Sequence, residues 1–101
     1  DVYKRQTYFG VPLVMVPQQF EQAFNARRIR KQGAGLMIKP EHLTVENLRA
    51  AVNDILTHEH YQRNASRLSR QIRALGGHVG AADEILRFTH GDARPSLRKT
   101  A

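Results

Sequence analysis

The most constraining feature of this sequence is a short apolar run, at positions 11–16, that does not alternate with polar residues. Gly10 precedes the run, Pro17 ends it, and Pro12 lies near its start. A strand with one solvent-facing side alternates between apolar and polar residues, so this run predicts a strand that is buried on both faces, as in a parallel sheet. Pro12 suits the first position of such a strand, where its missing N–H is tolerated.

A helix and a second strand are predicted directly after this strand. Residues 17–20 have the composition of a loop, and a helix is expected from Glu21 to about Gln32. Gly33 is a suitable C-terminal stop for that helix. A second short apolar segment follows at residues 36–38. A strand, a helix and a strand at this spacing predict a βαβ unit with a parallel pair of strands.

Three further helices are predicted over the rest of the chain, each with one apolar face. The first begins after Thr44, a residue type that caps helix N-termini well. The second follows a break at residues 58–60 and ends at Gly76-Gly77, and the third spans about residues 79–89. Their apolar faces consist of Val45, Leu48, Val52, Ile55 and Leu56 in the first, Tyr61, Ala65, Leu68, Ile72 and Leu75 in the second, and Val79, Ala82, Ile85 and Leu86 in the third.

Composition limits the class of protein. The chain has 101 residues, of which 41% are hydrophobic, so it is expected to be globular. It has no cysteine, so neither disulfides nor thiolate metal sites are expected. No apolar run approaches the roughly 20 residues of a membrane span. We also see no secretory signal, so a cytoplasmic protein without membrane association is expected. Two strands do not form an independently stable sheet, which predicts that the chain is part of a larger α/β domain.

The segment around the first strand resembles the second half of the donor-binding segment of the UDP-glycosyltransferase family, especially its bacterial macrolide-type members. In that family a Gly-Val-Pro precedes an apolar strand, which is followed by a proline and then by an acidic residue and a glutamine. The matching residues here are Gly10-Val11-Pro12, Pro17 and Glu21-Gln22, followed by Asn25-Ala26, Gly33-x-Gly35 and Gly76-Gly77.

This resemblance implies a two-domain GT-B enzyme, with the chain as the distal part of its C-terminal Rossmann-like domain. The expected fold class is therefore α/β, with two short parallel strands and about four helices. Residues 7–89 would form a partial nucleotide-sugar donor-binding domain, and residues 90–101 a flexible basic tail. The family's diphosphate-binding His-Gly turn, its ribose-binding Glu and its catalytic His would all lie upstream, so this fragment is expected to be inactive alone.

The resemblance also implies which residues contact the donor. The family's acidic residue and glutamine bind hydroxyls of the donor sugar, and this role falls on Glu21 and Gln22. A carboxylate accepts hydrogen bonds and an amide both donates and accepts, which suits sugar hydroxyls. Glu21 could equally be an acid that favours the first turn of a helix. The candidate residues of the donor loop are Pro17, Gln18, Gln19 and Asn25, of which Asn25 could either brace the loop or be a solvated helix residue.

The implied reaction is transfer of a hexose from a UDP-sugar to a hydroxyl of a small lipophilic acceptor, with inversion at the anomeric carbon. The UDP-sugar is a co-substrate, and neither a cofactor nor a metal is expected. The acceptor would be held by the N-terminal domain.

The first six residues, Asp1 to Gln6, resemble the in-frame translation of a transposase adapter used in sequencing libraries. They are therefore predicted to be foreign to the natural protein and are left out of the predicted fold; the alternative is a natural polar N-terminal segment.

A formal net charge of +7 leaves one alternative open, a basic helical module that binds nucleic acid. Arg63, Arg67, Arg70 and Arg73 recur at helical spacing and would carry that function. Their position beside an apolar face predicts instead the solvated side of an amphipathic helix, and nucleic acid is thus an unlikely partner. His58 and His60 flank Glu59 but lack the spacing of a zinc site, and a surface turn is expected there.

Overall fold

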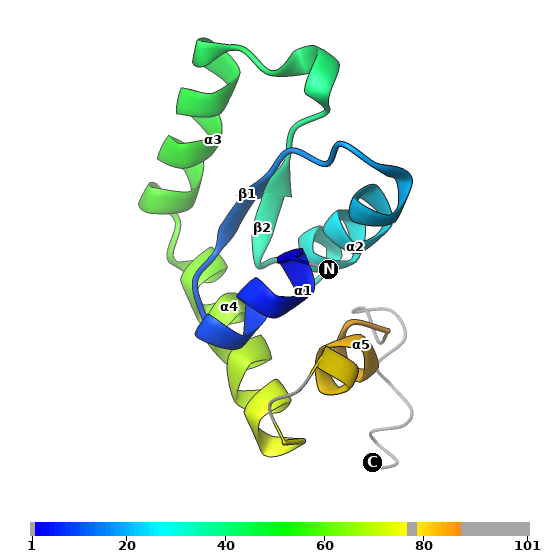
Figure 1. The fold of residues 1–101 in the computed structure, drawn as a ribbon. Helices are drawn as coiled ribbons and strands as arrows, with labels where there is room; N and C mark the ends of the chain where they lie inside the picture. The colour runs from blue at the N-terminus through cyan, green and yellow to red at the C-terminus, as the bar shows by residue number, and fades with distance from the viewer. Residues whose placement is uncertain (1, 77–78, 88–101) are drawn as a thin grey trace.

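The computed structural model describes residues 2–76 and 79–87, which form two parallel strands surrounded by helices (Figure 1). The predicted α/β class is confirmed. In chain order the elements are α1 (Val2–Gln6), η1 (Thr7–Phe9), β1 (Leu13–Met15), α2 (Phe20–Lys31), β2 (Gly35–Met37), η2 (Pro40–His42), α3 (Val45–Thr57), α4 (Glu59–Ala74) and α5 (Val79–Arg87).

The predicted parallel pair of strands joined by a helix is confirmed. β1 is shorter than predicted, and β2 begins and ends one residue earlier than predicted. β1 and β2 pair in parallel, with Leu13 opposite Gly35 and Met15 opposite Met37. The sequence predicted strands at residues 11–16 and 36–38. A strand exists only where a partner offers its backbone groups, and among the described residues each strand has one partner of three residues. Apolar character alone therefore overstated the length of β1.

Helix α2 runs from Phe20 to Lys31, one residue earlier at each end than predicted. Gln32 forms the C-cap, and Gly33 follows with a φ of +76°. A side chain is strained in this left-handed region, which explains why a glycine ends the helix. The turn at Gly33 directs the chain back, so that β2 begins beside β1.

Helix α4 carries most of its predicted apolar face into the core. Met15, Ala26, Ile29, Ala34, Ala65, Leu68 and Leu86 form one buried cluster that joins the sheet to α2, α4 and α5. Leu75 is the exception, because it lies beyond the last helical residue and is 48% exposed. The third predicted helix is confirmed as α5 up to Arg87; Gly77, Thr89 and the predicted tail at residues 90–101 lie outside the described residues.

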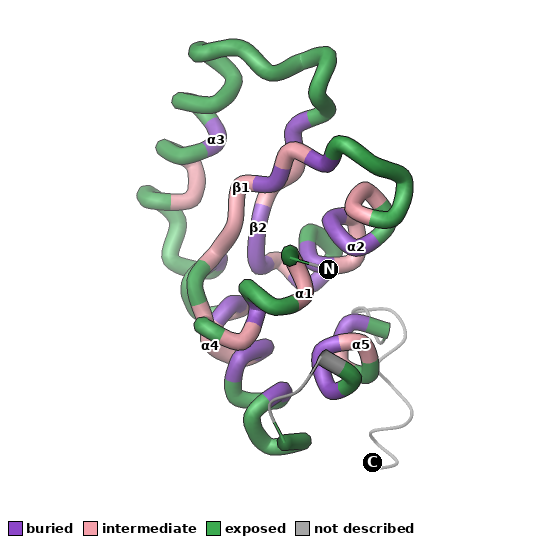
Figure 2. The backbone as a smooth tube through the Cα atoms, viewed as in Figure 1, coloured by how far each residue is buried: buried purple, intermediate pink, exposed green. Residues whose placement is uncertain are grey.

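Helix α3 has the predicted apolar residues, but most of the helix is exposed in the described structure (Figure 2). Thr44 caps the helix as expected, accepting a hydrogen bond from the Asn47 N–H at 3.0 Å. Val45 is 67% exposed and Leu56 is 78% exposed, with Leu48 and Val52 also in the exposed class. Ala51 is the helix's buried residue. The prediction of an amphipathic helix is thus confirmed, but among the described residues its apolar side is covered only in part, at Ala51 and the half-buried Ile55.

The first residues take part in the fold. Residues 2–6 form α1, and Tyr3 packs against the core cluster. The hydroxyl of Tyr3 accepts a hydrogen bond from the Val16 N–H at 3.2 Å, just beyond the end of β1. The expectation that this segment lies outside the fold is therefore wrong for the described structure. Its foreign origin stays a prediction.

Asp83 in α5 forms ion pairs with a side chain of α1 and a side chain of α2. Lys4 Nζ and Arg28 Nη1 each lie 3.4 Å from its Oδ1, and Arg28 Nη2 also donates to its backbone carbonyl at 3.0 Å. Desolvation favours the protonated carboxyl, but the charges and hydrogen bonds of Lys4 and Arg28 outweigh it and hold the pKa of Asp83 below its ordinary value. The ionised carboxylate thus helps to hold α5 against α1 and α2.

The lowered pKa gives a pH dependence with a definite sign. A group whose pKa is depressed by folding contributes stability above its unfolded-state pKa, and this contribution is lost as the pH falls through the folded-state pKa. We expect Asp83→Asn to lower the unfolding midpoint near neutral pH and to have no effect at pH values below the folded-state pKa. Thermal unfolding of both proteins across this range checks the expectation, with the exposed Glu84→Gln as a control. An equal penalty at every pH would contradict it.

Candidate donor-sugar site

The candidate site lies on the loop that joins β1 to α2, at the carboxyl end of a parallel strand. In open α/β sheets this is where ligands bind. Figure 1 shows the loop leaving the sheet and descending into α2, and Figure 2 shows that most of it is exposed. Pro17 is buried and anchors the start of the loop, whereas Gln18 and Gln19 are exposed. Of the predicted loop residues, Gln18 and Gln19 are therefore accessible to a ligand, whereas Pro17 and Asn25 are buried.

Glu21 is in the first turn of α2 and is exposed. No hydrogen bond or ion pair from the described residues reaches its carboxylate. Its position near the N-terminus of the helix suits a negative charge, whether or not a ligand is bound. The carboxylate is consequently free to accept hydrogen bonds from a ligand, and its position is also that of an ordinary first-turn acid.

Gln22 is half-buried and is already part of a hydrogen-bonded loop. Its Oε1 accepts from the backbone N–H of Gln18 at 2.9 Å. Gln18 Nε2 in turn donates to the carbonyl of Val16 at 3.4 Å. Gln22 and Glu21 are neighbours as predicted, but the two side chains differ, because one is free and the other is engaged within the protein.

Asn25 lies one helical turn after Glu21 and is 3% exposed, so the alternative of a solvated helix residue is wrong. Its Oδ1 accepts from Arg28 Nη1 at 3.1 Å, and Arg28 binds Asp83. Asn25 therefore contacts the arginine that forms an ion pair with Asp83 of α5. Its part in a donor loop stays a prediction.

Two phenylalanines beside the site were not singled out from the sequence. Phe20 was expected to be in the loop but is the first residue of α2, and it is 83% exposed. Phe24 follows one turn later, with the Arg28 guanidinium 5.3 Å from its ring centre. The signal that could have identified them is an aromatic residue directly before the Glu-Gln pair, repeated four residues on.

The arginine stripe of α4 is only partly a solvated face. Arg67 Nη2 donates to the Gln32 carbonyl at 3.0 Å, and burial together with the charge of Arg70 lowers its pKa. Arg73 lies over the ring of Tyr8 at 4.2 Å. These two arginines therefore interact with other parts of the chain. Fewer arginines of this row are then available to bind the phosphates of a nucleic acid.

The break predicted at residues 58–60 is one residue long, because His58 alone separates α3 from α4, and Glu59 and His60 begin α4. The junction is exposed, as expected for a surface position. His58 Nδ1 lies 2.8 Å from Asp54 Oδ1, and both side chains are largely exposed. Across residues 2–76 and 79–87, no three or more His, Asp or Glu side chains are grouped so that they could hold a metal ion. None of the helices in this part of the chain is long and apolar enough to cross a membrane.

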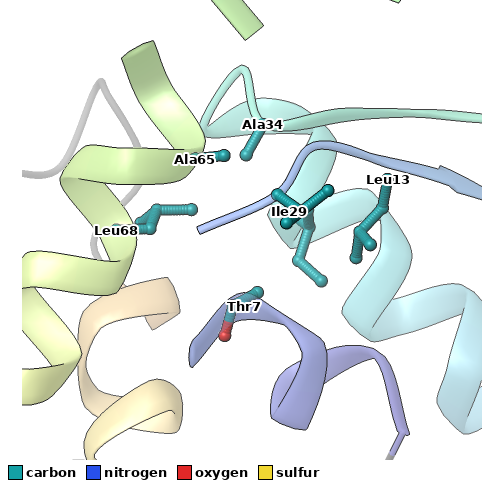
Figure 3. Close-up of a pocket in the computed structure, with 7 residues that line it drawn as sticks. Thr7, Leu13, Ile29, Ala34, Ala65 and Leu68 are labelled. Atoms are coloured by element: carbon teal, nitrogen blue, oxygen red, sulfur yellow. The ribbon is translucent and has the colours of Figure 1, made fainter. Parts of the chain in front are cut away.

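A narrow space inside the fold is a packing gap and not a ligand site (Figure 3). It leaves no volume that a water-sized molecule could occupy. Its walls come from η1, both strand regions, α2 and α4, so it marks where these elements meet. The lining residues are Thr7, Val11, Leu13, Ile29, Ala34, Ala65 and Leu68.

Comparison with known proteins identifies the family. The family described as erythromycin biosynthesis protein CIII-like, C-terminal domain, matches residues 3–76. Over 79 residues the chain is 40% identical to the NDP-glycosyltransferase YjiC of Bacillus licheniformis, covering 78% of this chain and 20% of that protein. It is 34% identical over 76 residues to the demethyllactenocin mycarosyltransferase of Streptomyces fradiae, covering 75% and 16%. It is 39% identical over 62 residues to UDP-glucuronosyltransferase 3A1 of Xenopus laevis, covering 61% and 12%.

The chain thus spans between 12% and 20% of the length of these three relatives. The matched stretch includes β1, the candidate loop, α2, β2, α3 and α4. It begins at Tyr3, inside the segment whose foreign origin is predicted. The chain belongs to the GT-B glycosyltransferases, as a fragment of their C-terminal domain.

Proposed function

We propose that this chain is the part of a hexosyltransferase that holds the sugar of a UDP-sugar donor, and that Glu21 makes the principal contact. The enzyme would transfer the hexose to a hydroxyl of a small lipophilic acceptor. The observation that carries the proposal is the exposed carboxylate of Glu21, which is unengaged within the described structure and lies just beyond the carboxyl end of β1. The names of the relatives, which include an NDP-glycosyltransferase, support the reaction class.

The chemistry of the pair suits a hexose. An ionised carboxylate only accepts hydrogen bonds and can accept from two neighbouring hydroxyls, and an amide NH₂ donates to a hydroxyl oxygen. Such charge-assisted hydrogen bonds are stronger than those between neutral groups. Glu21 and Gln22 would therefore orient the sugar, and would themselves take no part in the bond changes.

The transfer itself would be a single displacement at the anomeric carbon. The acceptor oxygen forms a bond to that carbon as the bond to the UDP oxygen breaks, UDP leaves with the electron pair, and a general base takes the acceptor proton. The base and the acceptor site would belong to the N-terminal domain of the full-length enzyme. The fragment alone would then be inactive, and no cofactor or metal would be required.

The test is donor kinetics of the full-length enzyme with Glu21→Ala and Glu21→Gln. Losing a hydrogen bond to a charged group costs about 1.5–3 kcal/mol, so kcat/KM for the UDP-sugar should fall about 10- to 150-fold in Glu21→Ala. Binding of UDP alone should not change, because UDP lacks the hexose. Calorimetry with UDP and initial rates with the UDP-sugar measure the two effects separately.

Glu46→Ala is the matched control. Glu46 is also an exposed acid in the first turn of a helix, in α3, but it is not on the candidate loop. Its loss should leave donor kinetics within about twofold of wild type, given the small effect of a first-turn acid. If Glu21→Ala behaves as Glu46→Ala does, Glu21 is only a helix-stabilising acid and the site assignment fails.

A further inference from the structure

Helix α3 carries an apolar strip that the described residues leave uncovered. Its large apolar residues recur at steps of three or four, so they lie along one side of the helix, and each is at least 41% exposed. An open groove of about 430 Å³ runs along them. The groove is lined by Val45, Leu48, Val52 and Leu56, which form the α3 strip, and by Arg49 and Asn53. A helix with one apolar side is stable when another element covers that side.

Strand β1 has an edge that no strand among the described residues pairs with. The backbone groups of Leu13 and Met15 point towards β2. Because the peptide groups of a strand alternate between its two edges, those of Val14 and Val16 face the other edge. The Val16 N–H donates to the Tyr3 hydroxyl there. The N–H and carbonyl of Val14 are therefore in position to pair with a further strand.

The α3 strip and this edge of β1 call for the same kind of cover. Figure 1 shows α3 and α2 on opposite sides of the two strands, and α3 contacts β2 and α4. A mostly parallel sheet has helices on both of its faces. If the sheet continues beyond β1, the helices on the face of α3 lie beside α3 and can cover its apolar side.

The size and charge of the α3 strip favour a cover from the same polypeptide. The helix has 13 residues, so the strip is about 20 Å long and about 10 Å wide. Each partner of a standard complex buries ~800 Å², so this strip alone is too small to hold a second copy. Arg49 is the one basic residue that lines the groove, which does not suit the phosphates of a nucleic acid. The chain also spans only 20% of the length of the Bacillus licheniformis relative.

We propose that the α3 strip is the surface on which the remainder of the C-terminal domain packs, through the apolar side of a helix. A strand of that remainder pairs with β1 at Val14. The partner is thus another part of the same polypeptide in the full-length enzyme. This inference does not depend on the donor-sugar assignment, because neither α3 nor the free edge of β1 belongs to the loop between β1 and α2.

Hydroxyl-radical footprinting of the full-length enzyme measures how exposed the leucine side chains are. Leu48 is 41% exposed and Leu75 is 48% exposed in the described structure, so similar oxidation rates would mean that nothing covers α3. We expect Leu48 and Leu56 to be oxidised severalfold more slowly than Leu75, in an enzyme that light scattering shows to be monomeric. Equal rates overturn the proposal. Protection found only in a dimer, and lost when the dimer is diluted, also overturns it and assigns the strip to a second copy.

Hydrogen exchange resolved to single residues tests the strand separately. The Val14 amide should exchange slowly in the full-length enzyme, as a paired strand amide does. Exchange as fast as that of an exposed loop amide, such as that of Gln19, would contradict a further strand at this edge.

A charged substitution gives a third measurement. Leu48→Asp should lower the thermal unfolding midpoint of the full-length enzyme by at least about 5 °C, because the carboxylate would be buried. The matched Leu75→Asp should change it by less than about 2 °C. Equal shifts in the two variants would contradict a covered α3. If Leu48→Asp gives no folded protein, footprinting of the wild-type enzyme still decides the matter.

Discussion

Replacing Gly35 by alanine is expected to prevent β1 and β2 from pairing and to leave the enzyme unfolded or insoluble. Gly35 is buried at the start of β2, opposite Leu13. A Cβ atom at this position would lie 2.5 Å from the Leu13 carbonyl oxygen and 3.1 Å from the terminal methyl of Met15. The methionine can move, but the carbonyl belongs to the paired strand. The cost should reach or exceed ~3 kcal/mol, the upper part of the usual range for overpacking.

Denaturant unfolding of the full-length enzyme, or its soluble yield if no folded protein is obtained, measures this effect. Gly80→Ala is the control, because Gly80 is exposed within α5 and alanine favours a helix there by about 0.5–1 kcal/mol. A Gly35→Ala enzyme with wild-type stability would show that the two strands do not approach each other as described.

Leu68→Ala should have the second large effect. Leu68 has no exposed surface and lies in the cluster that joins α4 to the sheet, α2 and α5. Removing a fully buried leucine side chain costs the lost burial and leaves a cavity, together ~2–5 kcal/mol. We expect a loss of this size in the free energy of unfolding, measured by denaturant titration.

Leu75→Ala provides a control from the same helical repeat. Leu75 is two turns after Leu68 but is 48% exposed beyond the end of α4. Its replacement should cost less than ~1 kcal/mol, as is usual away from the core. An equal loss of unfolding free energy in Leu68→Ala and Leu75→Ala would mean that Leu68 is not part of the buried core.

The sequence was a good guide where a local rule decides the structure. Thr44 caps α3 because its hydroxyl can accept from a nearby N–H, and Gly33 ends α2 because it tolerates a left-handed φ. The buried face of α4 follows from helical period. These features depend on residues close together in the chain, which a pattern can detect.

Features that depend on distant partners could not be predicted. Helix α1 has only five residues and is held by contacts such as that of Tyr3 with Val16, which no local pattern encodes. The length of β1 depends on β2. For α3, helical period identified the apolar side but not whether another element covers it.

The candidate site shows the same division. The place of Glu21 and Gln22 after a buried strand followed from the sequence, because the carboxyl end of a parallel strand is a known ligand position. The hydrogen bond between Gln18 and Gln22 did not, since it depends on how the loop turns into α2. The structure was therefore needed to show that the Gln22 side chain accepts a hydrogen bond from the loop whereas the Glu21 carboxylate is unengaged.

A structure of the full-length enzyme with an intact UDP-hexose bound would show whether Glu21 holds the donor sugar. The quantity to measure is the distance from the Glu21 carboxylate oxygens to the nearest hydroxyl of the hexose. We expect a hydrogen-bonding distance, about 2.5–3.0 Å. A hexose held elsewhere, with Glu21 facing solvent and no hydroxyl within reach, would contradict it.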